Sequence, residues 1–154
     1  MTIDKINQKI LQLLWENARL SFAEIGKSVH LSAPAVAERV RKMEATGVIT
    51  GYRVQIDSAA MGYPITAYIL VKVFHGQEAS FMAFVQQQPE VVGCVNVTGE
   101  KAFLLETAVS TITQLDDLLE RFAALSETST MIQLSSVVEP RLLGSETSLA
   151  KFRK

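Results

Sequence analysis

The 154-residue sequence contains one cysteine, Cys94, and only two histidines. A single cysteine cannot form an internal disulfide, so a disulfide-held fold is excluded and a reducing compartment is expected. The sequence also lacks the CxxC, HExxH, GxGxxG and GxxxxGK[ST] patterns of common zinc, dinucleotide and phosphate sites. We therefore expect no metal and no cofactor.

Long apolar segments are also missing, since no run approaches the roughly 20 residues that span a bilayer. The N-terminal residues show no basic segment followed by an apolar core, which is the pattern of a secretory signal. With 48% hydrophobic residues and only four prolines, the composition is that of a folded chain. These features predict a cytoplasmic protein.

The net charge of −1 conceals an asymmetry along the chain. Residues 1–55 contain eight basic and five acidic residues, a charge of +3. The remainder contains seven basic and eleven acidic residues, a charge of −4. A basic first third is compatible with nucleic-acid binding, although a difference of this size is weak evidence.

Residues 31–46, LSAPAVAERVRKMEAT, form the most informative segment. Ser32 is a good helix N-cap, and Pro34 falls in the first turn, where a missing N–H is tolerated. Val36, Val40 and Met43 recur at the spacing of one buried helix face. This pattern predicts the second helix of a helix-turn-helix, ending at Gly47. Its exposed face carries Pro34, Ala35, Glu38, Arg41, Lys42 and Ala45, with Arg39 at the margin.

Two shorter helices are predicted before this one. Asp4 can cap a helix that runs to about residue 17, and Ser21 followed by Glu24 is a capping box for a helix at 22–29. We expect Phe22 to be buried together with Ile25 and Val29. After the third helix, the alternation at 49–56 predicts a β-hairpin wing or an exit strand.

The second half of the chain predicts a βαββαβ order, the ferredoxin-like arrangement. The expected strands are 65–74, 91–97, 102–109 and 131–138, and the expected helices are 78–87 and 112–125. The strand at 65–74 is largely apolar on both faces, so the sheet face without helices needs a cover. The simplest cover is a second copy of the sheet, which predicts a homodimer.

The fold class expected is therefore α+β, with an N-terminal winged helix-turn-helix and a C-terminal ferredoxin-like βαββαβ domain. The DNA-binding domain is expected at 1–56 and a linker at 57–64. A ferredoxin-like oligomerisation domain at 65–139 and a C-terminal tail at 140–154 complete the expected organisation. The tail carries no motif that distinguishes a solvated from a partner-contacting segment.

The motifs taken together make the chain resemble the Lrp/AsnC (leucine-responsive, feast/famine) family of transcriptional regulators. The resemblance covers nearly the whole chain, and its second half matches by element order more than by motif. The segments that carry it are NARLSFAEI at 17–25, VHLSAPAV at 29–36, ERVRKME at 38–44 and GVITGY at 47–52, after Ile3, Asp4, Ile10 and Leu11.

The resemblance implies a DNA-binding regulator that binds double-stranded DNA as a dimer-based oligomer, such as an octamer, and responds to an amino acid. It implies that the domain at 65–139 is an effector-binding and oligomerisation domain. It also implies a bacterial or archaeal, nucleoid-associated protein. By position, the residues expected to face DNA are Ser21, Phe22, Ser32, Ala33, Pro34, Ala35, Arg39, Arg41 and Lys42. Arg41 and Lys42 can reach base edges or phosphates. Arg39 is expected to hold phosphate or a structural carboxylate such as Glu44.

The effector turn departs from the family pattern. Members that bind amino acids typically have G-D-x-D where this chain has Gly99, Glu100, Lys101 and Ala102. Glu100 keeps the first negative charge, whereas Ala102 removes the second carboxylate. The ligand is therefore not a simple amino acid, or binds through other groups, or is absent.

Two alternatives stay open at this level. One is an architectural protein that wraps DNA with little sequence or effector dependence. The other is an enzyme, because some haem-pathway decarboxylases resemble the same family. That chemistry needs a cluster of His and Arg, whereas this chain places His30 in a helix turn and His75 at a strand end. Cys94 is expected to be a core residue, and we expect no catalytic residue.

Overall fold

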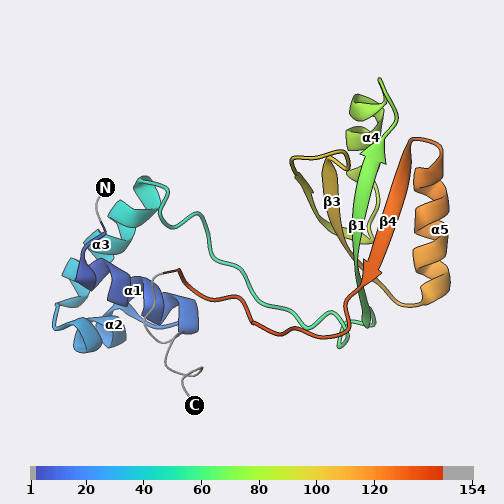
Figure 1. The fold of residues 1–154 in the computed structure, drawn as a ribbon. Helices are drawn as coiled ribbons and strands as arrows, with labels where there is room; N and C mark the ends of the chain where they lie inside the picture. The colour runs from blue at the N-terminus through green and yellow to red at the C-terminus, as the bar shows by residue number, and fades with distance from the viewer. Residues whose placement is uncertain (1–2, 144–154) are drawn as a thin grey trace, which may run out of the picture. The chain divides into compact units, whose positions relative to one another are not determined.

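A computed structural model describes residues 3–143 of the chain, which form two compact units (Figure 1). The helical unit comprises residues 3–54 and 138–143, and the sheet unit comprises residues 55–137. No helix among the described residues has the length and apolar character needed to cross a membrane. In chain order the elements are α1 (Lys5–Glu16), α2 (Phe22–Val29), α3 (Ala33–Ala45), β1 (Ile65–Val73), α4 (Glu78–Val85), β2 (Val91–Asn96), β3 (Phe103–Val109), α5 (Ile112–Ala123) and β4 (Ser126–Ile132).

The three helices of the helical unit begin where the sequence predicts. Asp4, Ser21 and Ser32 are their N-caps, and each accepts a hydrogen bond from a backbone N–H in the first turn. Gly47, with φ +72°, follows the end of α3 in the left-handed region that favours glycine. The unit's core consists of the buried side chains of Ile10, Ile25, Val36, Val40 and Met43.

Two predictions about the helical unit are wrong. Residues 50–57 form no strand, so the hairpin wing or exit strand is not present in the single chain. A strand requires a hydrogen-bonded neighbour, and these residues pair with no other described segment as a ladder. Phe22 is 41% exposed although it lies three residues before the fully buried Ile25, since it is the first residue of α2 and lies at the end of the helix.

The C-terminal segment returns to the helical unit. Leu142 lines an apolar cavity of about 210 Å³ together with Leu14, Trp15 and Tyr52. Residues 144–154, most of the predicted tail, lie outside the described residues. The described part of the tail thus has an apolar side chain against the first helix and the segment after α3.

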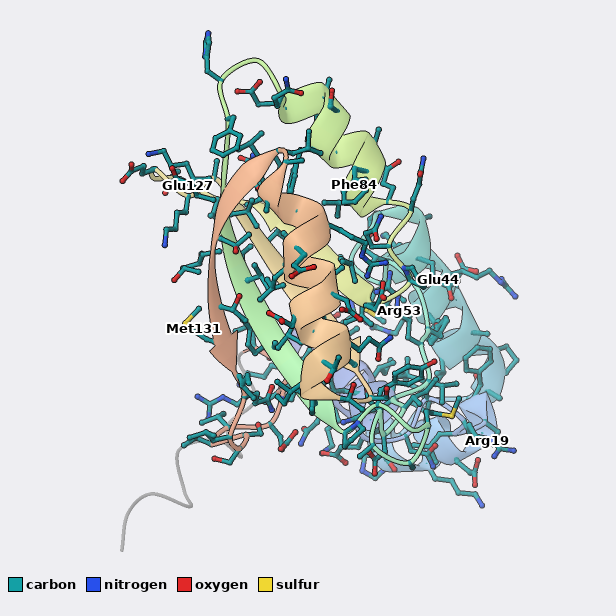
Figure 2. The ribbon with its side chains drawn as sticks, turned by 90° about the vertical axis from the view of Figure 1, so that its right-hand side faces the viewer. Arg19, Glu44, Arg53, Phe84, Glu127 and Met131 are labelled. Atoms are coloured by element: carbon teal, nitrogen blue, oxygen red, sulfur yellow. The ribbon has the colours of Figure 1, made fainter. Side chains whose placement is uncertain are left out.

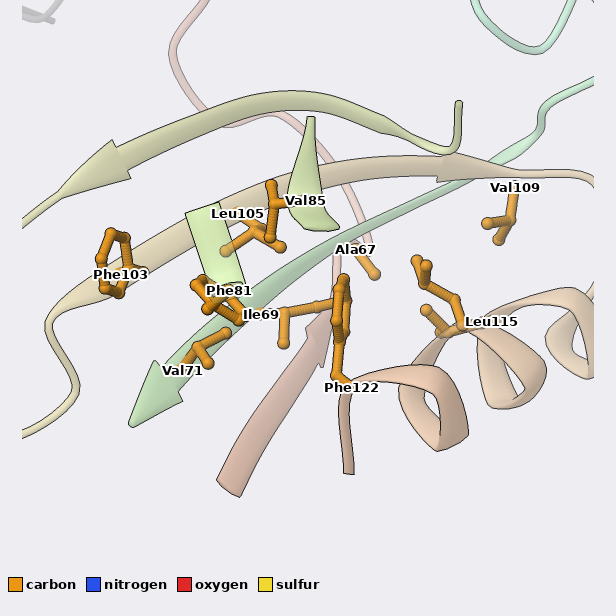
Figure 3. Close-up of a cluster of buried hydrophobic side chains, with 11 residues drawn as sticks. Ala67, Ile69, Val71, Phe81, Val85, Phe103, Leu105, Val109, Leu115 and Phe122 are labelled. Carbon is orange, nitrogen blue, oxygen red and sulfur yellow. The ribbon is translucent and has the colours of Figure 1, made fainter. Parts of the chain in front are cut away.

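The sheet unit confirms the βαββαβ order. Its strands are antiparallel and lie in the order β2-β3-β1-β4, and α4 and α5 cover one face (Figure 1). Phe81 from α4 and Phe122 from α5 pack over Ile69 and Leu105 of the central strands (Figure 3). The rings of Phe81 and Phe122 have centroids 5.9 Å apart. This core fixes both helices on the sheet.

Two predictions about the sheet unit need correction. The last strand is Ser126–Ile132 rather than 131–138, because β4 pairs with β1 in a register that sets Ser126 opposite Val73 and Ile132 opposite Ala67. An edge strand tolerates polar residues, so its sequence gives little apolar signal. Cys94 is exposed on the other edge strand, β2, and is not a core residue.

Neither helix of the sheet unit, α4 or α5, covers the second face of the sheet. Strand register places Leu70, Leu104 and Val95 in one row across β1, β3 and β2 on this face. Figure 2 shows Glu127 and Met131 of β4 pointing away from the helices. Val95 is 55% exposed and Met131 48% exposed. The single chain therefore leaves apolar side chains on an open sheet face.

Candidate nucleic-acid interface and effector turn

The turn between α2 and α3 is closed by tight backbone contact. His30 ends α2 in the left-handed conformation, with φ 56°, and the Leu31 N–H donates to the Gly26 carbonyl at 3.0 Å. A Cβ on Gly26 would lie 2.4 Å from the Leu31 carbonyl oxygen. Only glycine fits this approach. The sequence prediction missed Gly26, although a glycine in the middle of a helix is the signal that could have indicated it.

The residues predicted to face DNA differ in exposure. All of them lie in the helical unit, on α2, α3 or their N-caps. Ser21, Phe22, Ser32, Pro34, Arg41 and Lys42 are exposed, whereas Ala33, Ala35 and Arg39 are half-buried.

Arg41 is held only by its own helix. Its Nη1 donates to Glu38 Oε2 at 3.0 Å, and both side chains are more than 70% exposed. An exposed pair of this kind contributes little stability and is readily exchanged. Lys42, one residue on, is exposed and has no ion pair within residues 3–143. Two cations are therefore accessible near the C-terminal half of α3.

Arg39 has a structural role instead. Its Nη1 donates to Asp4 Oδ2 at 2.8 Å and to Asn7 Oδ1 at 3.0 Å, which joins α3 to the start of α1. The hydrogen bond from Arg39, and then that from the Asn7 N–H, lower the pKa of the Asp4 carboxyl. The expected partner, Glu44, instead accepts a hydrogen bond from the Tyr52 hydroxyl at 2.8 Å.

The N-terminus of α2 is capped by the carboxylate of Glu24, a residue of the same helix. Glu24 Oε2 accepts from the Ser21 N–H at 2.7 Å and from the Ser21 hydroxyl at 2.6 Å, while the Glu24 N–H donates to Ser21 Oγ at 3.3 Å. The Ser21 hydroxyl, followed by the Ser21 N–H, lowers the pKa of the Glu24 carboxyl. The positive end of the helix is thereby already neutralised by a resident anion.

The predicted effector residues lie in the turn between β2 and β3. The Val97 N–H donates to the Ala102 carbonyl at 2.7 Å, and Gly99 has φ +119°. Glu100 Oε1 accepts from Lys72 Nζ of β1 at 2.5 Å, a partner that the sequence prediction missed. The Lys72 hydrogen bond lowers the pKa of the Glu100 carboxyl, and the same bond raises the pKa of Lys72. Ala102 packs on the sheet core, and Lys101 is half-buried.

Known proteins share both units. A family model for the AsnC-type helix-turn-helix domain matches residues 3–44, and a model for the Lrp/AsnC ligand binding domain matches residues 66–143. The HTH-type transcriptional regulator Rv2324 of Mycobacterium tuberculosis is 36% identical over 143 residues, which cover 89% of this chain and 95% of that protein. LrpC of Bacillus subtilis is 26% identical over 137 residues, covering 89% and 95% of the two chains.

Solved structures agree with this comparison. The structure of Bacillus subtilis LrpC matches with a TM-score of 0.86 at 26% identity, covering 91% of this chain and all of that one. The transcriptional regulator NMB0573 of Neisseria meningitidis, solved as an L-Met complex, matches with a TM-score of 0.82 at 26% identity over 90% and 94% of the chains.

A helix-turn-helix unit with accessible cations, joined to an α+β ligand-binding unit, defines a DNA-binding transcriptional regulator. The matched family models cover nearly all of the described chain, and they do so in the order in which its two units occur. This chain belongs to the Lrp/AsnC family of transcriptional regulators.

Proposed function

We propose that the chain regulates transcription in the cytoplasm by binding double-stranded DNA with the exposed face of α3. The observation that supports this most directly is the separation of roles on α3, where Arg39 is tied to Asp4 while Arg41 and Lys42 are accessible. Arg41 reads a base edge, and Lys42 contacts phosphate. Few other polar side chains lie on this face, so DNA shape supplies much of the preference. We propose no catalytic role, because the relatives are transcriptional regulators.

Selection of bound sequences from a random duplex pool, followed by fluorescence anisotropy, tests this role. Arg41→Ala should weaken binding to the selected site by about tenfold or more and relax preference at one position. Lys42→Ala should weaken all duplexes alike and reduce the salt dependence. Lys9→Ala, on α1, is the charge-matched control. Equal loss on every sequence for Arg41→Ala would support the architectural alternative, and no loss for either variant would refute the interface.

We propose further that two copies associate through the open face of the sheet. The apolar row of Leu70, Leu104 and Val95 crosses the centre of this face, and Tyr68 lies beside Met131 in the next row. A two-fold arrangement covers these side chains with the same surface of a second copy and presents two α3 helices to DNA. Higher assembly, such as an octamer, would extend from this dimer.

Sedimentation velocity tests the dimer. Leu70→Glu puts a charge at the centre of the face and should shift the protein toward the monomer. Met82→Glu is the matched control, because Met82 is 48% exposed on α4, over the opposite face of the sheet. A wild-type monomer at micromolar concentration, or a dimer unchanged by Leu70→Glu, would contradict the proposal.

We infer that an amino-acid effector, if it uses the turn at Gly99–Ala102, competes with Lys72 for Glu100. NMB0573 was solved with L-Met, and the present chain keeps only one carboxylate in the corresponding turn. The Lys72 ammonium already occupies Oε1 of that carboxylate, so a ligand ammonium must share the carboxylate with Lys72 or displace it. Calorimetric titration with L-methionine should give weak binding that Lys72→Met strengthens and Glu100→Gln abolishes. Tight binding that is indifferent to both substitutions would exclude this turn.

A further inference from the structure

A buried carboxylate lies in the sheet unit away from the effector turn. Glu90 directly precedes β2, and its carbonyl accepts the Ala108 N–H at 2.9 Å, which fixes its backbone against the end of β3. Its side chain is only 9% exposed. Glu90 Oε1 accepts from Arg121 Nη2 of α5 at 2.7 Å. The other oxygen, Oε2, is buried and has no hydrogen-bond partner among residues 3–143.

The Glu90 carboxyl is ionised despite its burial. Burial is the largest single influence and raises its pKa, but the hydrogen bond and charge of Arg121, together with backbone and Gln114 hydrogen bonds, hold the pKa below the ordinary value. The Gln114 side chain also favours the ionised form, although it makes no hydrogen bond to Oε2. An ionised oxygen without a donor is rare in folded proteins, since buried polar atoms are almost always paired. Oε2 therefore has an unused capacity to accept a hydrogen bond.

Glu90 lines an open cavity of about 440 Å³ beside α5. The spacing of Gln114, Asp117 and Glu120 places them on one side of that helix, and Arg121 completes the lining. Three carboxylates and one guanidinium give the cavity a net charge of −2. The amide oxygen of Gln114 already accepts two hydrogen bonds from Ser110, at 2.8 and 2.9 Å. The cavity thus offers acceptors with negative charge and few free donors other than Arg121.

We propose that this cavity, defined by Glu90, Gln114, Asp117, Glu120 and Arg121, binds a small aliphatic compound with two ammonium groups. One ammonium donates to Glu90 Oε2, and the second is attracted by the exposed carboxylates of Asp117 and Glu120. A bare metal ion does not fit, because the described residues contain no group of three or more His, Cys, Asp or Glu side chains placed to hold one. A ligand that carries its own N–H donors fits both the orphan acceptor and the charge.

The same chemistry occurs in a free diamine and in a basic amino acid. The two differ in the α-carboxylate, for which Arg121 is the nearest cation of the lining. Only one nitrogen of Arg121 is used by Glu90, so its guanidinium can still donate elsewhere. Comparison of 1,5-diaminopentane with L-lysine therefore separates a site for diamines from one for amino acids.

Isothermal titration calorimetry on the full-length protein tests the site with 1,5-diaminopentane, L-lysine and glutarate. We expect saturable binding of the diamine or of lysine, or of both, and none of glutarate. Glu90→Gln keeps the shape of the side chain and should weaken binding by about tenfold or more, because it removes a charge-assisted hydrogen bond. Glu120→Gln alters only an exposed charge and should weaken the diamine more than pentylamine, which has one ammonium. This second variant keeps the proposal testable if Glu90→Gln fails to fold.

Glu78→Gln, which removes an exposed carboxylate of α4 outside the cavity, is the matched control and should bind as the wild type does. Glu100→Gln should also be without effect, which separates this cavity from the effector turn. Absence of binding by both amines, binding of glutarate, or equal weakening by Glu78→Gln and Glu120→Gln would overturn the proposal. The readout does not involve DNA, so its failure is distinct from failure of the regulatory function.

Discussion

The helical unit and the sheet unit stabilise their helices in different ways. In the helical unit the buried core is five aliphatic side chains, and every helix begins at a side-chain cap. In the sheet unit Thr111 caps α5, but α4 begins at Gln77 without a side-chain hydrogen bond, and yet its Phe81 is fully buried in a core of eleven residues. A small core thus depends on local polar bonds, whereas a large aromatic core tolerates an uncapped helix.

The units also use ion pairs differently. The Arg39–Asp4 pair of the helical unit joins two helices near the surface, with side chains 32% and 51% exposed. The Arg121–Glu90 pair of the sheet unit has a carboxylate that is only 9% exposed and half satisfied. In the first pair both oxygens of the carboxylate accept hydrogen bonds, and the pair has a structural role. The second leaves an acceptor free in a cavity, which is where we place a ligand.

The largest difference expected between the two units is in the stability lost when a phenylalanine ring is removed. Phe122 is fully buried and touches Phe81 and Phe84, so Phe122→Ala should destabilise the sheet unit by about 3–5 kcal/mol. Phe22→Ala removes the same ring from a position that is 41% exposed, and it should cost about 1 kcal/mol or less. Urea unfolding followed by circular dichroism measures both. Equal losses would contradict the contrast between a buried ring of the sheet unit and an exposed ring of the helical unit.

Gly26→Ala should have the next largest effect and should act on the helical unit. The added Cβ meets the Leu31 carbonyl oxygen, so the turn must open at a cost of about 1–3 kcal/mol. DNA affinity should fall with it, because the turn sets the angle between α2 and α3. Gly93→Ala in β2 is the control, since its new Cβ would make only ordinary contacts at 3.7 Å. A Gly26→Ala protein with wild-type stability would show that the turn adapts without cost.

The same contrast explains which parts of the fold could be predicted from the sequence. The boundaries of α1, α2 and α3 depend on neighbours a few residues away, such as Ser21 and Glu24, and those signals were sufficient. The position of β4 depends on its register with β1, some 60 residues away, and the apolar run after residue 131 suggested a strand several residues too late. Local propensity cannot reveal a pairing that only the assembled sheet determines.

The candidate sites follow the same rule. The exposed face of α3 could be predicted because helical periodicity assigns Arg41 and Lys42 to it. The partner of Arg39 could not, because Asp4 lies 35 residues earlier and becomes a neighbour only when α1 packs on α3. The pairing of Lys72 with Glu100 and the cavity beside Glu90 are likewise products of the sheet topology. Sequence reasoning identified the groups that project outward and missed the partners that folding supplies.

Replacing each arginine of α3 singly by methionine should show that Arg39 contributes to stability whereas Arg41 does not. Arg39→Met should lower the melting temperature, because it leaves the buried Asn7 without its Arg39 donor and Asp4 without a cation. Arg41→Met should change the free energy of unfolding by no more than about 0.5 kcal/mol and so leave the melting temperature close to that of the wild type, since it breaks only an exposed pair. Differential scanning calorimetry gives both values. A larger loss of stability for Arg41→Met would reverse the roles assigned here.

The smallest effect expected is a pH dependence of the Arg39 contribution. The pKa of Asp4 is lowered in the folded protein, first by Arg39, so its stabilising interaction is fully present above the unfolded value of about 3.9. The stabilisation is lost as the pH falls through the folded pKa, because the protonated carboxyl no longer pairs with the guanidinium.

The difference in melting temperature between wild type and Arg39→Met should therefore be constant from pH 7 to pH 5 and shrink toward pH 3. Other carboxylates titrate in the same range, but Glu24 and its bond to Ser21 are common to both proteins and cancel in the difference. If the gap persists unchanged at low pH, the bond from Arg39 to the neutral Asn7 amide, rather than the ion pair with Asp4, is what joins α3 to α1.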